Sequence, residues 1–185
     1  MGRNDAGLAA LHRAVALDPL NPNPRSQLAD ALRSAGRYDE AIAAFKGAQA
    51  VDQNEDHYGM NAEIGITHYL LGELQAAQSF CEKPTVEAEN ISMLCLALVY
   101  HKLGRHRDAE NQLRRLRIAD GDGGFLEYAD IYAQWGDRAK ALESLDTAMR
   151  LRDPNLMEMK SDRLLDPIRQ EPRFKAIVQA LKFPD

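Results

Sequence analysis

Residues 21–53 read NPNPRSQLADALRSAGRYDEAIAAFKGAQAVDQ, and this stretch decides the fold of the chain. Gly36 separates two segments in which alanine and large apolar residues recur at helical spacing. Ala29 stands seven residues before this glycine, and Ala41 and Phe45 follow it, four residues apart. Small residues allow two short helices to reach the usual interaxial distance of about 8–10 Å, and glycine readily adopts the left-handed backbone of a tight turn. The stretch therefore predicts a hairpin of two helices.

The same phrase recurs along most of the chain. Turn glycines follow one another at spacings of 34, 36, 32 and 32 residues, and each has a small residue five positions later. One hairpin cannot bury its apolar face alone, so several such hairpins are expected to stack into a solenoid. The glycines are Gly2, Gly36, Gly72, Gly104 and Gly136, and their small partners are Gly7, Ala41, Ala77, Ala109 and Ala141.

At these residues the chain resembles the tetratricopeptide repeat family, whose unit is a helix–turn–helix of about 34 residues. The resemblance implies an all-α fold, an α-α superhelix of such hairpins with a C-terminal capping helix. We expect a repeat array over residues 1–154 and a capping segment over 155–185. The array divides into a half repeat at 2–21 and full repeats at about 22–55, 58–89, 90–121 and 122–154.

The pattern also places the individual helices. Pro84 stands where a helical residue belongs, and a proline inside a helix removes a hydrogen bond, so the helix before it should end near Glu82. A last helix is expected at about 172–182, with Phe174, Ile177, Val178 and Leu181 forming one apolar stripe. The other predicted helices are 6–18, 22–35, 38–51, 56–71, 74–82, 87–103, 106–119, 123–135 and 138–152.

Composition narrows the class of protein. The net charge is −5, and acidic and basic residues alternate without the basic stripe of a nucleic-acid binder. No apolar run of about 18 residues is present, so we expect no membrane insertion. Cys81 and Cys95 are not arranged as a CxxC pair, and we expect two free cysteines, which weakly favours a reducing compartment and a cytoplasmic location.

The motifs of catalysis are missing from the sequence. It contains no HExxH pair, no phosphate-binding loop and no nucleophile elbow. We therefore predict that the chain is not an enzyme and that it carries no cofactor and no metal site.

The family resemblance implies a concave groove, lined by the first helix of each repeat, which holds a protein or peptide. The clamp for a C-terminal carboxylate found in some chaperone-binding members is absent, because its positions hold Ser26, Asp30, Ala62 and Ile66. Exposed Tyr69, Leu94 and Leu98 would suit a partner with apolar anchors. Alternatively, the C-terminal segment or a neighbouring domain covers them. Carried over by position, the candidate groove residues are Asn23, Ser26, Asp30, Arg33, Ile66, Tyr69, Leu94, Leu98, His101, Lys102 and Asp130.

The C-terminal part carries a second resemblance. The run from Tyr128 to Leu156 and the run SDRLLDPIRQEPRFKAIVQAL at 161–181 resemble the end of repeat regions in bacterial multidomain signalling proteins. In those, similar regions follow winged-helix, nucleotide-cyclase or serine/threonine-kinase domains. Because the array begins in the middle of a repeat at Gly2, we also expect a piece of a longer protein.

These observations favour a protein-interaction or regulatory scaffold. Its expected partner is a protein or peptide, a domain of its own parent chain, or a second copy. Two alternatives stay open: a sensor of a small ligand or signalling peptide that controls an attached effector domain, and an accessory region that orders the substrates of an enzyme.

Overall fold

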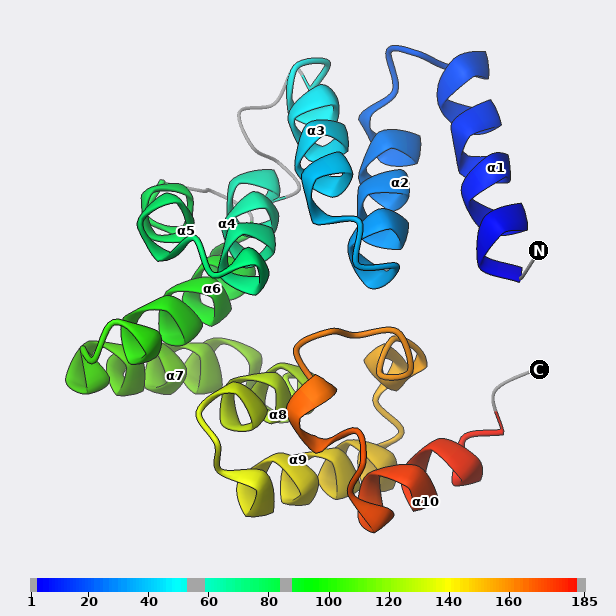
Figure 1. The fold of residues 1–185 in the computed structure, drawn as a ribbon. Helices are drawn as coiled ribbons and strands as arrows, with labels where there is room; N and C mark the ends of the chain where they lie inside the picture. Colours follow the sequence, from blue (N-terminus) through cyan, green and yellow to red (C-terminus); the bar gives the residue numbers. More distant parts are fainter. Residues whose placement is uncertain (1–2, 53–58, 84–87, 183–185) are drawn as a thin grey trace.

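The computed structural model describes residues 3–52, 59–83 and 88–182. Over these residues the chain is helical, and consecutive helices pack side by side (Figure 1). The α-helices are α1 (Arg3–Leu17), α2 (Pro22–Ser34), α3 (Tyr38–Gln49), α4 (Met60–Leu71), α5 (Leu74–Cys81), α6 (Glu89–Lys102), α7 (His106–Asp120), α8 (Phe125–Gln134), α9 (Arg138–Leu151) and α10 (Pro172–Ala180). Short 3-10 helices are η1 (Gly121–Gly123), η2 (Pro154–Met157) and η3 (Asp166–Ile168).

The predicted helices are confirmed, most of them to within one or two residues at each end. α5 ends at Cys81, close to the expected Glu82. Pro84 itself lies outside the described residues. α1 begins at Arg3 rather than near residue 6, and α4 begins at Met60 rather than near residue 56, a predicted start that lies outside the described residues.

The hairpin turns are built as the glycine pattern predicts. Gly36, Gly72, Gly104 and Gly136 all have φ between 77° and 83°, a conformation that a side chain disfavours. At the crossing points the small residues are fully buried, with Ala29 and Ala41 both at 0% exposure.

Gly65 takes the place of alanine where α4 crosses α5, and the structure shows the reason. A Cβ atom at this position would lie 2.6 Å from Cys81 Sγ and 2.8 Å from Cys95 Sγ. Both distances are shorter than carbon and sulfur can approach, so the close packing of α4 against α5 and α6 requires glycine.

The two cysteines correct an expectation from the sequence. Cys81, at the end of α5, and Cys95, in the middle of α6, are joined as a disulfide with Cα atoms 5.7 Å apart. The prediction of two free cysteines was therefore wrong. Sequence spacing could not show the pairing, because it depends on how α6 returns across α5 after the connection at 82–88.

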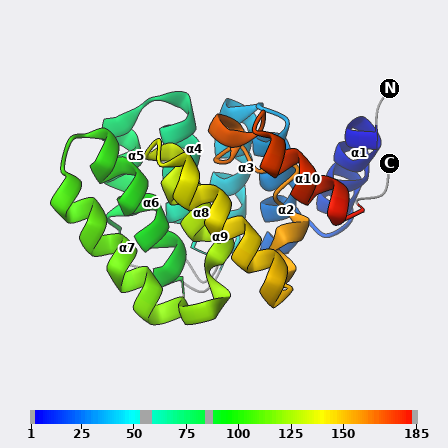
Figure 2. The same ribbon diagram turned by 90° about the horizontal axis from the view of Figure 1, so that it is seen from below.

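The helices follow one another around a curved path, and α2, α4, α6 and α8 face its inner side (Figures 1 and 2). One continuous apolar core runs from Ala62 in α4 to Ile177 in α10. Two smaller clusters hold the N-terminal helices together, one around Leu8 and Leu28 and the other around Phe45 and Ile64.

The C-terminal segment has two parts. α10 packs on α9 with Phe174 and Ile177 buried and Val178 and Leu181 partly buried, which confirms the predicted apolar stripe. Between α9 and α10 the chain, with η2 and η3, turns back over the inner side of the curve toward α2 (orange in Figure 1).

Candidate functional site

The inner side of the curve contains a cavity of about 520 Å³ between the repeat helices and the returning C-terminal segment. This volume lies in the range of ligand sites. The cavity is lined by Asp30, Ala31, Arg33 and Ser34 of α2, Glu63, Ile66 and Leu70 of α4, Ile91 and Leu94 of α6, Leu126, Glu127 and Asp130 of α8, and Asn155, Glu158, Ser161, Asp162, Arg163 and Leu164 of the C-terminal segment.

The structure brings only part of the predicted groove together around this cavity. Asp30, Arg33, Ile66, Leu94 and Asp130 line it. Assigning groove residues by their position in the repeat identified these five, because α2, α4, α6 and α8 present equivalent faces to the inner side of the curve.

The other predicted groove residues lie elsewhere. Asn23 is exposed and Ser26 half-buried near the start of α2, away from the cavity lining. Lys102 is exposed at the end of α6, and the ring of His101 stacks on Trp135 with centroids 4.8 Å apart. These four remain predictions as binding residues.

Two expected apolar anchors are part of the core instead. Leu98 is fully buried among α6 and its neighbours, and Tyr69 is 7% exposed. Leu94 lines the cavity but is only 3% exposed. The expectation of exposed Tyr69, Leu94 and Leu98 was therefore wrong, because the helices and the C-terminal segment pack over these side chains.

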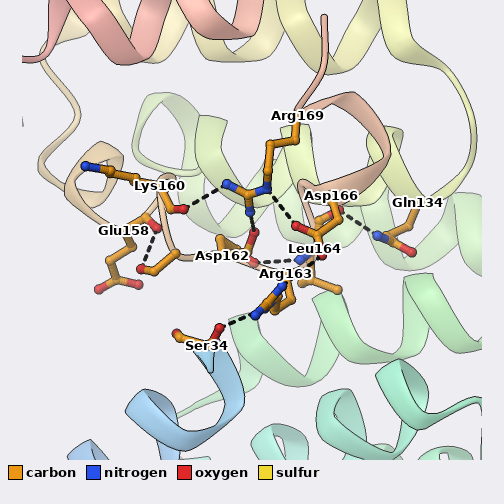
Figure 3. A network of polar contacts seen from close by, with 10 residues as sticks. Ser34, Gln134, Glu158, Lys160, Asp162, Arg163, Leu164, Asp166 and Arg169 are labelled. Carbon is orange, nitrogen blue, oxygen red and sulfur yellow. Dashed lines mark hydrogen bonds and ion pairs between the residues drawn. The ribbon is translucent and has the colours of Figure 1, made fainter. Parts of the chain in front are cut away.

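The alternative given by the sequence, a C-terminal segment that covers this surface, agrees with the structure. The Tyr69 hydroxyl donates to Gln134 Oε1 at 3.1 Å, and Gln134 Nε2 donates to the Leu164 carbonyl at 2.6 Å. Arg163 Nε donates to the Ser34 carbonyl at 2.7 Å, which fastens the segment to the end of α2 (Figure 3).

The segment is also held by bonds within itself. Arg169 donates to the carbonyls of Lys160 and Asp162 and pairs with Asp166, with Nε and Oδ1 2.7 Å apart (Figure 3). Asp162 Oδ1 accepts the backbone N–H of Leu164 at 2.8 Å. These bonds fix a turn that presents Asp162 to the cavity. In the sequence, the only sign of this segment is the apolar set Leu164, Leu165 and Ile168. Such a set indicates that the segment packs on the end of the array, but it does not predict that the segment turns toward the inner side.

Carboxyl groups dominate the chemistry of the cavity. On the α2 side Arg33 pairs with Asp30, with Nη2 and Oδ1 2.9 Å apart, and with Glu63. Burial, followed by the charge of Glu63, raises the pKa of Asp30 to about 7. Its side chain stays 49% exposed inside this concave wall, so water screens part of that effect.

The α8 side is more deeply buried. Burial raises the pKa of Glu127 to about 7. Burial, followed by the charges of Asp162 and Glu127 and a hydrogen bond to Asp162, raises the pKa of Asp130 well above its usual range. Burial likewise raises the pKa of Glu158 and Asp162. Sequence position alone could not show this, because Asp162 arrives from a segment outside the repeats.

Other kinds of site can be assessed over the same residues. Within the described ranges no group of three or more histidine, cysteine, aspartate or glutamate side chains is placed to hold a metal ion. No helix among the described residues is long and apolar enough to cross a membrane.

Stacked helical hairpins with an inner cavity define a superhelical repeat protein. Three family models described as tetratricopeptide repeat match residues 1–64, 92–115 and 124–155. The chain belongs to the tetratricopeptide repeat family.

A solved structure gives the same fold. The crystal structure of YrrB, described as a TPR protein with an unusual peptide-binding site, aligns over 94% of this chain and 98% of its own, with a TM-score of 0.50 and 16% identity. At this identity the likeness shows the fold alone. A comparison with curated proteins found no match.

Proposed function

We propose that the chain is a non-catalytic scaffold that binds a peptide or a segment of another protein in the cavity on its inner side. The observation that carries this proposal is the cavity itself, which is formed by four successive first helices and the C-terminal segment. Concave surfaces of this kind are how solenoid proteins present an extended binding face.

Two facts support this function. Tetratricopeptide repeats generally serve as protein-interaction scaffolds, and the chain carries them over most of its length. YrrB, which shares the fold, has a peptide-binding site. The setting we expect is a bacterial signalling or regulatory protein, which is what the resemblance of residues 128–181 implies.

The walls of the cavity suit a peptide. Leu70 and Ile91, which are only partly buried, provide apolar surface, and the carboxyl groups and the Asn155 side chain provide hydrogen-bond partners beside it. A mixture of apolar contact area with a few placed polar groups is typical of sites that select one peptide sequence.

The test is selection of peptides from a random library displayed on phage, using the full 185-residue chain. One selected peptide is then measured by calorimetry against Ser34→Trp, which fills the cavity from the end of α2. The matched control is Ala43→Trp on the exposed face of α3. Groove binding predicts that Ser34→Trp weakens affinity about tenfold or more while Ala43→Trp does not. Failure to select any peptide, or equal affinity for both variants, would contradict the proposed function.

A further inference from the structure

The charges that line the cavity are unbalanced. On the α2 side the Arg33 guanidinium already pairs with Asp30 and Glu63. Arg163 is engaged by the Ser34 carbonyl and by Asp166, whose Oδ2 lies 3.5 Å from Nη1. Both basic groups of the cavity are therefore committed. The remaining lining groups of ionisable type are all acidic: Glu127, Asp130, Glu158 and Asp162.

Two oxygen atoms in this acidic wall lack a hydrogen-bond partner. Asp130 is 3% exposed; a hydrogen bond links its carboxyl group to Asp162, while its Oδ1 atom is buried without any partner in the described part of the chain. Glu127 Oε2, about one helical turn away on α8, is also buried without a hydrogen-bond partner in the described part of the chain. Buried polar atoms of native proteins are nearly always satisfied, so two such acceptors beside one cavity indicate a missing donor.

The surroundings fit a donor that is positively charged and carried on an apolar stem. Leu70 and Ile91 line the same cavity, are only partly buried, and would contact methylene groups. Lysine and arginine side chains combine such a stem with an ammonium or guanidinium head that donates several hydrogen bonds.

We propose that the cavity receives a lysine or arginine side chain of the bound peptide, with Glu127 and Asp130 accepting hydrogen bonds from its charged head and Asp162 facing it from the C-terminal segment. This inference rests on the proposed peptide-binding function and names the chemistry of the partner. It requires small movements of the two carboxyl side chains toward the cavity, since both unpartnered oxygens are covered from water.

The titration of the cavity supports a cationic partner. Burial raises the pKa of Glu127 to about 7, so this group is only partly ionised near neutral pH, and burial raises the pKa of Asp130 well above its usual range. A bound cation favours the ionised carboxylates and must displace protons. Binding is therefore expected to release protons and to tighten as the pH rises from 6 to 8. The titratable and charged groups that face the cavity are Asp30 and Arg33 of α2, Glu63 of α4, Glu127 and Asp130 of α8, and Glu158, Asp162 and Arg163 of the C-terminal segment.

The experiment uses the peptides selected on the full chain. Selected peptides should share a lysine or arginine, and replacing that residue by methionine should weaken binding about tenfold or more. The double variant Glu127→Gln/Asp130→Asn should weaken the original peptide similarly but leave the methionine peptide unaffected. Circular dichroism at pH 8 checks that the double variant is folded, which is expected because both side chains become neutral and stay polar.

The outcomes separate this inference from the proposed function. Two results would contradict the cationic partner and still support binding in the cavity. In one, the selected peptides are sensitive to Ser34→Trp but share no basic residue; in the other, they bind the double variant as tightly as the wild type. Calorimetry in buffers of different ionisation enthalpy gives a second readout, and binding without proton release at pH 6.5 would also count against the inference.

Discussion

The two ends of the helical array are covered very differently. At the N-terminal end α1 packs on α2 through a small cluster around Leu8, and Leu17 and Leu20 remain 86% and 78% exposed. At the C-terminal end residues 154–180 fold back, and Leu165 and Ile168 are fully buried in the main core.

This difference explains where the charged cavity comes from. The returning segment contributes apolar side chains to the core and, on its other side, Asp162 and Glu158 to the cavity. Burial of these leucines and isoleucines stabilises the segment enough to hold carboxyl groups close to those of α8. A repeat array alone would leave this inner face open to water.

The largest expected effect tests the comparison directly. Leu165→Ala should lower the free energy of unfolding by about 2–5 kcal/mol, because it opens a hole in a fully buried site. Leu17→Ala, at an exposed leucine of the other end, should change it by less than about 0.5 kcal/mol. Urea unfolding followed by circular dichroism measures both, and equal losses would show that the two ends contribute alike.

The second prediction concerns the disulfide, which fastens α5 to α6 where the N-terminal clusters give way to the continuous core. Closing a loop between cysteines 14 residues apart stabilises a fold by about 3 kcal/mol, so reduction should lower the unfolding free energy by that order.

The control is Cys81→Ser/Cys95→Ser, whose stability should not respond to reductant. Mass spectrometry after alkylation gives the direct check. Labelling of both cysteines before any reductant is added would show that the thiols are free.

The third prediction is a pH effect of the acidic wall. Because burial raises the pKa of Asp130 in the folded state, the folded chain holds this proton more tightly than the unfolded chain. The contribution of Asp130 is therefore most favourable below its unfolded pKa and is lost as pH rises toward the folded value. Asp130→Asn should remove this loss, so its stability relative to the wild type should improve as the pH rises from 5 to 8.

The measurement is urea unfolding of both proteins at several pH values. Asp146→Asn, which removes an exposed carboxylate of α9 that pairs with Arg173 of α10, serves as the control substitution. Parallel pH profiles for wild type and Asp130→Asn would contradict a raised pKa at this site.

The sequence was sufficient for the repeats and insufficient for the site, for a physical reason. Helix boundaries and turn glycines follow from local spacing. The residues equivalent to Gly36 and Ala41 have the same role in every hairpin, so one hairpin predicts the others. The cavity joins Asp130 to Asp162 and Ser34 to Arg163, pairs that are 32 and 129 residues apart. Such pairs depend on the direction in which the chain leaves α9, and no repeat pattern encodes that direction.

The cysteine pair illustrates the same limit. Cys81 could be assigned to the core from its place in a repeat, whereas Cys95 could not, and both are buried. Their mutual approach depends on the glycine at position 65, which leaves space for both sulfur atoms between α4 and the next two helices.

The smallest expected effect concerns the fastening between the two regions. Arg163→Ala removes the bond to the Ser34 carbonyl, a contact between the C-terminal segment and α2 near the edge of the cavity. A partly exposed side chain of this kind contributes about 1 kcal/mol or less, so global stability should change little.

Local opening should change more, since the segment would remain attached chiefly through Leu164, Leu165 and the Gln134 bond. Hydrogen exchange of residues 158–168 is expected to become several-fold faster, while that of α6 stays the same. Lys175→Ala, which removes one exposed positive charge from α10, is the matched control and should leave exchange in both regions unchanged. If exchange at residues 158–168 is unchanged in Arg163→Ala, the apolar contacts alone hold the segment in place. In that case α2 does not help to shape the cavity.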